Sequence, residues 1–305
     1  MLVLQRKPKS FGRIDGSAIR PDRFQSLSLP EIETTPLQTD DGNVNLSEVF
    51  EVIRSGSDRT DVTLINGDCS LMDGLATQMQ SGTLCVLGSV GNHLGRGMLG
   101  GTVVISEHAK SHTACGLHDG LVYVGGNCES RLAGQEPGHK SGMRGGDVFV
   151  RGNVGDRACE RMRRGTVFVA GSIGPYAASQ LIAGTLVVMG DLGPNWGGGM
   201  RRGTIVLGRD YEGLPTASLS EAREFELSFL PLVWRHVERL QADAHFVLAT
   251  AIASLQPLGI KANGAIPAWT KIPTTRWVQR QIADLNYRGK GEVLVLRRNS
   301  SPSVS

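Results

Sequence analysis

The chain has 305 residues, of which 40% are hydrophobic and 5% aromatic, and it contains 40 glycines but only 13 prolines. This apolar fraction is enough for one to three folded domains, and the absence of a Gly-X-Y period excludes a collagen-like chain. A formal net charge of +3 is too small to indicate nucleic-acid binding, and no stretch approaches the roughly 18 apolar residues of a membrane-spanning helix. The N-terminal apolar run is too short for a signal peptide, so we expect a cytoplasmic protein without nucleic-acid or membrane partners.

Residues 1–60 do not repeat. A first strand is expected at Leu2–Leu4, and Asn45 is placed to cap a short helix with three apolar residues on one side, Leu46, Phe50 and Ile53. A repetitive array begins directly after this segment, and an array of strands needs its first edge covered. We therefore interpret residues 1–60 as an N-terminal cap.

From residue 61 to residue 210, one phrase returns at a fixed interval. Copies such as TVFVAGSIGPYAASQLIAG from Thr166 and TLVVMGDLGPNWGGGMRRG from Thr185 are 19 residues long. The glycines that close successive copies are separated by 19, 19, 26, 19, 19 and 19 residues: Gly82, Gly101, Gly120, Gly146, Gly165, Gly184 and Gly203. A fixed period is typical of an array in which each unit buries its apolar face against its neighbours.

Each repeat has one short strand and no room for a helical hairpin. The residues two and four positions after each closing glycine are aliphatic, and positions two apart share one face of a strand. The first column is Leu84, Val103, Val122, Val148, Val167, Leu186 and Ile205, and the second is Val86, Ile105, Val124, Val150, Val169, Val188 and Leu207. Three residues before each closing glycine lies a third column: Met79, Met98, Leu117, Met143, Met162, Leu181 and Met200. This pattern predicts one coil of a parallel β-solenoid per repeat, with coils about 4.8 Å apart.

Glycine phrases such as GSIGPYAA, which begins at Gly171 and contains Gly174, separate the apolar columns. They indicate corners that need positive φ or close backbone approach. A dinucleotide-binding fingerprint requires a helix after its glycines, and a P-loop requires Gly-Lys-Ser/Thr. Each phrase here returns to a strand, so we exclude a nucleotide-binding loop.

The spaced glycines GxxGxxxG, the recurring Met-x-x-Gly and the insert PGHKSGMRGG from Pro137 resemble the C subunit of formylmethanofuran dehydrogenase and its counterpart in the bacterial formyltransferase/hydrolase complex. This GXGXG repeat is also similar to the C-terminal domain of the glutamate synthase large subunit. The resemblance covers about residues 25–210, and the insert with the following GNVGDRACERMRRG favours the first family. It implies a right-handed parallel β-helix without an active site of its own. The expected fold is thus mainly β, with about seven 19-residue coils over 61–210 between non-repetitive α/β caps.

The third and fourth repeats depart from the pattern. They lack the regular GxxG, and seven extra residues lie within Arg131–Ser141. The region holds four histidines, His108, His112, His118 and His139, but their spacing matches no zinc pattern, and we expect no metal on this chain. The five cysteines form no CxxC pair and are expected to be buried thiols: Cys69, Cys85, Cys115, Cys128 and Cys159.

After residue 210 the period stops, and we interpret residues 211–305 as a C-terminal cap and docking segment. Phe225, Leu227 and Phe229 alternate as in a strand, and Pro231 is expected to open a helix. Three further elements are expected along this segment: an apolar helix over 244–256, an amphipathic helix over Arg276–Leu285, and a strand within RGKGEVLVLRR from Arg288.

The chain contains no GxSxG elbow, HExxH motif or zinc-type Cys/His spacing, so we expect a non-catalytic scaffold subunit without a cofactor. The resemblance implies a complex that handles formyl groups on a furan-type carrier in tetrahydromethanopterin-linked one-carbon metabolism (methylotrophy). It implies a metal-bearing amidohydrolase-like partner subunit and a formyltransferase partner subunit. Two alternatives stay open: a glutamate-synthase-like domain that partners an amidotransferase, and a carbohydrate-active β-helix enzyme.

Two surfaces are candidate contact sites. The column three residues after each closing glycine is an apolar stripe through Tyr123, Phe149 and Phe168, which we expect the C-terminal segment or another subunit to cover. The second surface, two residues before the closing glycines, is a basic edge, formed by Arg144, Arg163 and Arg201 with Arg164 and Arg202 beside them. This edge is either simply solvated, or it binds acidic groups of a partner or the anionic tail of the carrier.

Overall fold

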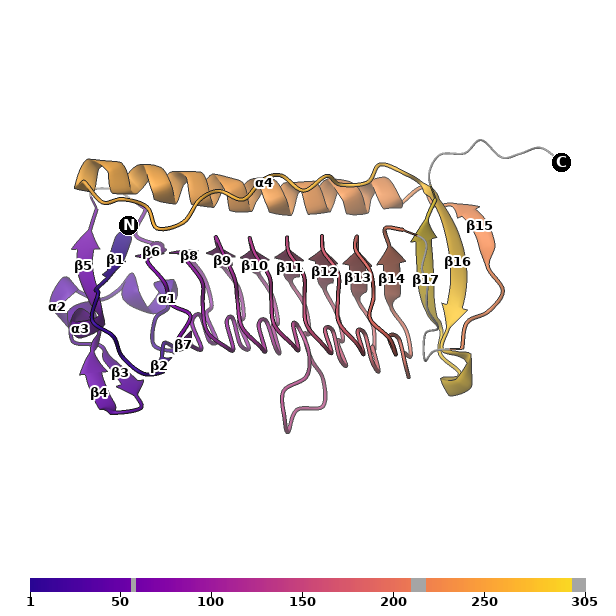
Figure 1. Ribbon diagram of the computed structural model, residues 1–305, viewed down its shortest axis with the longest axis horizontal. Coiled ribbons are helices and arrows are strands. Elements are labelled where there is room, and N and C mark those ends of the chain that lie inside the picture. Colours follow the sequence, from indigo (N-terminus) through magenta and orange to yellow (C-terminus); the bar gives the residue numbers. More distant parts are fainter. Residues whose placement is uncertain (56–58, 210–217, 298–305) are drawn as a thin grey trace.

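The computed structural model describes residues 1–55, 59–209 and 218–297, so the predicted boundary at residue 210 lies outside the described residues. The fold is mainly β, and its main element is an open sheet of 13 strands that are mostly parallel (Figure 1). Eight parallel strands follow one another in sequence order: β6 (Val62–Asn66), β8 (Thr83–Leu87), β9 (Thr102–Ile105), β10 (Leu121–Val124), β11 (Asp147–Val150), β12 (Thr166–Val169), β13 (Thr185–Val188) and β14 (Thr204–Leu207).

The 19-residue period of the sequence is the pairing register of these strands. Val167 of β12 lies beside Val148 and Leu186, which are 19 residues away on either side. A second ladder of parallel bridges follows the same steps, for example Val154 to Ile173 and Ile173 to Leu192. The three predicted apolar columns are all fully buried, because each repeat places them against the repeats before and after it.

The glycine corners have two different causes. The closing glycine Gly165 has a φ of +98°, a conformation that glycine adopts without steric cost. Gly174 does not have positive φ. A Cβ atom there would lie 2.4 Å from Asp156 Oδ1 and 3.0 Å from the Gly155 carbonyl carbon, so the position requires glycine because successive repeats approach closely.

The N-terminal residues extend the sheet beyond β6. β1 (Leu2–Arg6) pairs in parallel with β6 and antiparallel with β5 (Phe50–Arg54). The predicted first strand is therefore confirmed. The predicted helix is shorter than expected: α3 (Leu46–Val49) begins after Asn45, whose backbone N–H donates to Glu48 Oε1 at 3.0 Å, and the chain then turns directly into β5. Beside these strands lie a small sheet, in the order β4 (Gly42–Asn45), β3 (Pro36–Thr39), β2 (Ile14–Asp15) and β7 (Met72–Asp73), and two short helices, α1 (Pro21–Phe24) and α2 (Leu29–Glu33).

The C-terminal residues contribute a helix and three strands. A single helix, α4 (Leu230–Leu255), replaces the two helices predicted around Pro231 and over 244–256, and a 3₁₀ turn, η1 (Gln256–Leu258), follows it. The predicted strand within RGKGEVLVLRR is confirmed at β17 (Gly291–Leu296). The strand expected through Phe225, Leu227 and Phe229 is confirmed only in part, because β15 (Arg223–Glu226) ends before Leu227. The amphipathic helix predicted over Arg276–Leu285 is wrong: β16 (Trp277–Ala283) is a strand between β15 and β17, and the 3₁₀ turn η2 (Leu285–Tyr287) follows it.

These strands complete the sheet at the end opposite β5. β17 pairs in parallel with β14, in the position where a further repeat would lie. Strand pairing therefore overrides the helical periodicity of the β16 sequence, because the outer edge of β17 would otherwise leave its backbone donors and acceptors unpaired.

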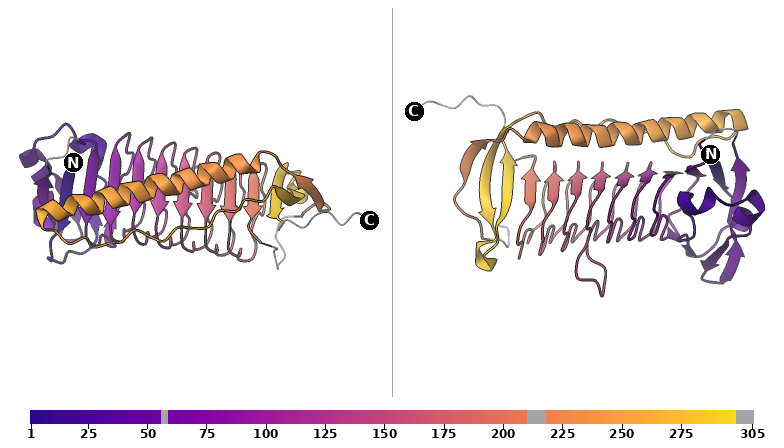
Figure 2. Two further views of the ribbon diagram at one scale, coloured as in Figure 1. Left: turned by 90° about the horizontal axis from the view of Figure 1, so that it is seen from above. Right: turned by 180° about the vertical axis from the view of Figure 1, so that it is seen from behind.

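Helix α4 crosses the outer face of the parallel strands, and an extended segment returns beside it along the molecule (Figure 2). Neither α4 nor any other described helix has the length and apolarity to cross a membrane. The apolar stripe is fully buried under this helix. Phe149 stacks on Tyr123 and Phe168 with ring centroids 5.2 and 4.8 Å apart, and Tyr123 Oη lies 3.5 Å from His245 Nε2 of α4. We expected either the C-terminal segment or another subunit to cover the stripe. The C-terminal segment covers it, through helix α4.

Candidate functional site

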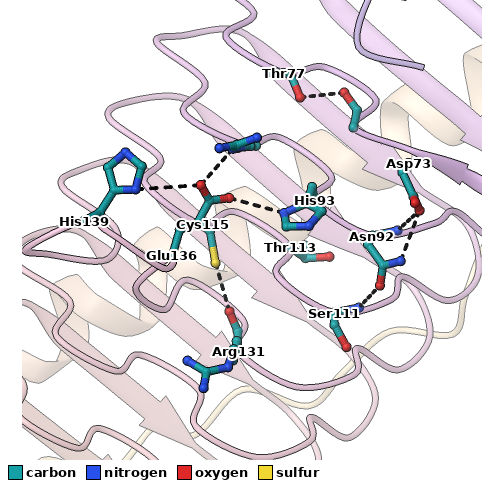
Figure 3. A network of polar contacts seen from close by, with 12 residues as sticks. Asp73, Thr77, Asn92, His93, Ser111, Thr113, Cys115, Arg131, Glu136 and His139 are labelled. Carbon is teal, nitrogen blue, oxygen red and sulfur yellow. Dashed lines mark hydrogen bonds and ion pairs between the residues drawn. The ribbon is translucent and has the colours of Figure 1, made fainter. Parts of the chain in front are cut away.

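The insert between β10 and β11 projects from the side of the molecule opposite α4 (Figure 1). It carries Glu136, whose side chain is only 8% exposed and points back toward an earlier repeat (Figure 3). Glu136 Oε2 lies 2.8 Å from Arg96 Nε, and Glu136 Oε1 lies 3.2 Å from His93 Nδ1. A buried carboxylate is costly without charged or hydrogen-bonded partners, so these contacts anchor the insert to residues about 40 positions earlier in the chain.

One partner of Glu136, His93, lies on a column of left-handed backbone positions. His93 and His112 have φ values of +60° and +64°, and their rings stack with centroids 4.8 Å apart. The backbone N–H of His93 donates to Ser111 O at 2.9 Å, which holds the two repeats in this register. Burial is the main cause that lowers the pKa of His112, and His93 and Arg131 lower it further. The stack therefore favours a neutral His112.

The same column continues with Arg131 and Arg157, which share a second carboxylate. Arg131 Nη1 lies 2.9 Å from Glu160 Oε2, and Arg157 Nη1 lies 3.2 Å from Glu160 Oε1. Cys115 Sγ donates to the backbone carbonyl of Arg131 at 3.2 Å (Figure 3). The column is thus a run of cationic and imidazole groups balanced by two glutamates.

A cavity of about 420 Å³ lies beside the insert, and we call it the insert cavity. Its lining includes Arg96, His118, His139 and Arg144 together with the single acidic residue Glu136. Glu136 already binds Arg96 by an ion pair, whereas the Arg144 side chain donates to Ser141 Oγ at 3.3 Å. Guanidinium groups around a small cavity suit an anion, because they donate charge-assisted hydrogen bonds.

The four predicted histidines are brought to different places. His118 and His139 line the insert cavity, His112 stacks on His93, and His108 Nδ1 accepts the backbone N–H of Asn127 at 3.0 Å. Across 1–55, 59–209 and 218–297, no group of three or more His, Cys, Asp or Glu side chains is arranged to hold a metal ion.

All five cysteines are buried free thiols, as the sequence predicts. Burial raises the pKa of Cys69, Cys85 and Cys159 to about 12, and it also raises the pKa of Cys115 and Cys128. Since the thiolate is the reactive form, these residues are held in their unreactive state at neutral pH.

The arginines of the predicted basic edge lie in different surroundings. Arg144 is half-buried in the insert cavity, and Arg163 follows it one repeat later, where its backbone N–H donates to Met143 O at 2.8 Å. Arg201 lines a second cavity, described below, whereas Arg164 and Arg202 are exposed and line neither cavity. Within the described ranges, none of Arg163, Arg164, Arg201 and Arg202 forms an ion pair.

The sequence did not reveal Glu136, Arg96 and His93 as a group. The only available signal was an acidic residue within the insert that interrupts the array. No other repeat has a residue at the position equivalent to Glu136. The 19-residue period therefore cannot predict which residues Glu136 contacts.

Comparisons with known proteins find a family model and a curated relative that each match part of the chain. The GXGXG motif family matches residues 137–219. The C subunit of the molybdenum-containing formylmethanofuran dehydrogenase 1 of Methanothermobacter marburgensis is 37% identical over 92 residues, which are 29% of this chain and 22% of that relative. The matched segment thus spans about a fifth of the relative's length.

A structural relative covers far more of the chain. One chain of the crystal structure of the formyltransferase/hydrolase complex (FhcABCD) from Methylorubrum extorquens, determined with methylofuran, aligns with 97% of this chain and 100% of its own length. The TM-score is 0.76 and the sequence identity is 29%. Together these findings confirm the predicted resemblance to the family of formylmethanofuran dehydrogenase C subunits.

Proposed function

We propose that this chain is a non-catalytic scaffold subunit of a formyltransferase/hydrolase complex in tetrahydromethanopterin-linked one-carbon metabolism. The observation that carries the proposal is the similarity over 97% of the chain to a chain of such a complex, since it includes both non-repetitive ends as well as the repeats. The GXGXG motif accounts for the repeats, but it does not require similar non-repetitive segments at the two ends of the chain. Their similarity therefore supports a shared assembly role rather than a shared motif only.

We further infer that the repeats form a right-handed parallel β-helix of about seven coils, with caps over 1–60 and 211–305. Three sets of contacts support it: the parallel strands, the ladder of isolated bridges, and backbone hydrogen bonds between bends, such as Arg157 N to Pro175 O at 2.9 Å. Each set advances by one repeat. The right-handed sense is implied by the resemblance.

The described side chains support a structural role. Glu136 and Glu160 are engaged in ion pairs within the chain, and the thiols are held protonated by burial. We propose that catalysis resides in partners, namely an amidohydrolase-like subunit that holds the metal and a formyltransferase subunit, and that the complex is cytoplasmic. The basic edge would contact acidic side chains of a partner or the anionic tail of a furan-type carrier.

Co-purification tests the assembly. The chain, tagged and expressed in its own host, is expected to bring down amidohydrolase-like and formyltransferase subunits, and formyl hydrolysis and transfer should appear in the assembly but not in the purified single chain. A single chain that catalysed either reaction would overturn the scaffold assignment.

The same experiment separates the alternative. A glutamate-synthase-like domain would instead co-purify with an amidotransferase.

The basic edge is tested by substitution. Complexes with Arg163→Gln or Arg201→Gln should assemble less completely or bind carrier with a weaker salt dependence. Unchanged assembly, affinity and salt dependence would leave the edge merely solvated.

A further inference from the structure

A second cavity lies on the same face of the molecule as the insert cavity, but among later repeats. Its volume is about 950 Å³, and we call it the basic cavity. Lys140, Arg161 and Arg201 line it together with two tyrosines, Tyr176 and Tyr287, and no Asp or Glu is among its lining residues. Lys140 comes from the insert, which also supplies Glu136, His139 and Ser141 to the insert cavity, so the insert contributes side chains to both cavities.

The two cavities occupy equivalent positions of the repeat. Gln78 and Gly97 line the insert cavity, and Arg161, Gln180 and Gly199 of the same column line the basic cavity. Backbone hydrogen bonds from Arg161 N to Ser179 O (3.0 Å) and from Gln180 N to Gly198 O (2.7 Å) set this column. The two cavities therefore lie along one column of the array.

The insert cavity and the basic cavity differ in the charges of their lining residues. In the insert cavity the chain supplies its own anion, the Glu136 carboxylate, to Arg96. In the basic cavity no carboxylate lies among the lining residues, and three cations lie around one space. Clustered cations without a counter-charge repel one another, and this cost is offset when an anion binds between them.

The basic cavity also has fixed donors and a flat, partly apolar lining. Arg161 Nε donates to Gln180 Oε1 at 2.6 Å, which orients the guanidinium group. Tyr176 is held under Arg157, whose Cζ lies 5.0 Å from the ring centroid, and Ile182 adds an aliphatic surface. Gly198 and Gly199 leave room between the walls because they have no side chains.

We propose that the basic cavity binds an organic anion through carboxylate or phosphate groups held by Arg161, Arg201 and Lys140, with a planar or apolar part against Tyr176 and Ile182. Arginine suits both carboxylate and phosphate, because its planar donors can bind two oxygens at once. The inference deepens the anionic contact proposed above and rests on that part of the proposed function alone. Its test requires neither partners nor turnover.

Calorimetric titration of the full chain with four probes tests the site: benzene-1,3,5-tricarboxylate, citrate, phenyl phosphate and inorganic phosphate. We expect an aromatic anion to bind at low salt more tightly than the non-aromatic anion of the same class, and affinity to fall as salt rises. The tighter class, carboxylate or phosphate, identifies the source of the anionic groups.

Matched variants make the result specific. Arg201→Gln and Arg161→Gln should each weaken binding by about tenfold or more, as expected for loss of a charge-assisted hydrogen bond. Arg202→Gln removes the same charge from the neighbouring residue, which does not line the cavity, and should change affinity less than threefold. Equal weakening by Arg201→Gln and Arg202→Gln would show diffuse attraction and overturn the proposal, as would the absence of binding by all four probes.

Discussion

The carboxylate of Asp284 takes the place of a missing repeat at the end of the array: its Oδ2 accepts the backbone N–H of Gly199 at 3.1 Å. In earlier repeats the equivalent donors, Arg161 N and Gln180 N, bind carbonyls of the following repeat. Among residues 1–55, 59–209 and 218–297, no bend of a further repeat follows that of Gly199. A side chain from the segment after β16 therefore satisfies a donor that would otherwise be buried without a partner.

Asp284→Ala should destabilise the chain by about 2–3 kcal/mol, because the fully buried carboxylate also accepts the N–H groups of Ser218 and Asn286. Asp284→Asn keeps one acceptor oxygen and should lose less. Urea unfolding measures both, with Asp243→Ala on the exposed face of α4 as the control. If Asp284→Ala lost no more stability than the control, the capping role would be wrong.

Gly174→Val should cost about 1–3 kcal/mol, since a Cβ atom would meet the preceding repeat at 2.4 Å. Pro175→Ala next to it should cost much less. Thermal melts of the two variants compare the positions directly. Equal tolerance would mean that successive repeats can move apart at this corner.

Phe149→Ala should cost about 3–5 kcal/mol, because it leaves a space between the stacked rings of Tyr123 and Phe168 and helix α4. Phe246 lies on α4 but is 65% exposed, so Phe246→Ala should change stability by about 0.5 kcal/mol or less. Chemical denaturation gives both values. Similar losses at the two positions would contradict burial of the stripe by this helix.

Glu136→Gln should loosen the insert, because it removes the negative charge that Arg96 and His93 bind. We expect trypsin to cleave after Lys140 several-fold faster in this variant, as measured by mass spectrometry of the products. Glu129→Gln, which changes an exposed glutamate nearby, is the control. Identical cleavage rates in the two variants would show that the ion pair does not hold the insert.

His112 should make stability depend on pH. Its folded-state pKa is lowered by burial, His93 and Arg131, with Arg96 lowering and Glu136 raising it. Protonation therefore favours the unfolded chain, and the stability that His112 contributes is present above its unfolded pKa of about 6.5 and is lost as pH falls below it. The pKa of His245 is lowered as well, so the wild type must be compared with His112→Asn, which tolerates positive φ. The decrease in melting temperature between pH 7.5 and pH 5.5 should be smaller in the variant than in the wild type. An equal decrease would show that His112 does not contribute to the pH dependence of stability.

The sequence determined the repetitive part of this protein. Strand positions, the three buried columns and the stripe of Tyr123, Phe149 and Phe168 follow from a 19-residue period, because each repeat contacts only its neighbours and equivalent residues must then lie in register. The period could not show why Gly174 is glycine. Close approach between repeats is a property of the backbone in space, not of the spacing along the chain.

Only the tertiary structure decided the contacts between residues that the 19-residue repeat does not relate. Glu136 meets Arg96 and His93, Asp284 meets Gly199, and β16 is a strand despite its helical spacing. The physical reason is the same in each case. A non-repetitive segment takes the structure that satisfies the exposed edge or charge it reaches. For Glu136 and Asp284, the residues that supply this charge or donor lie 40 and 85 positions away. For β16, the exposed edge is that of β17.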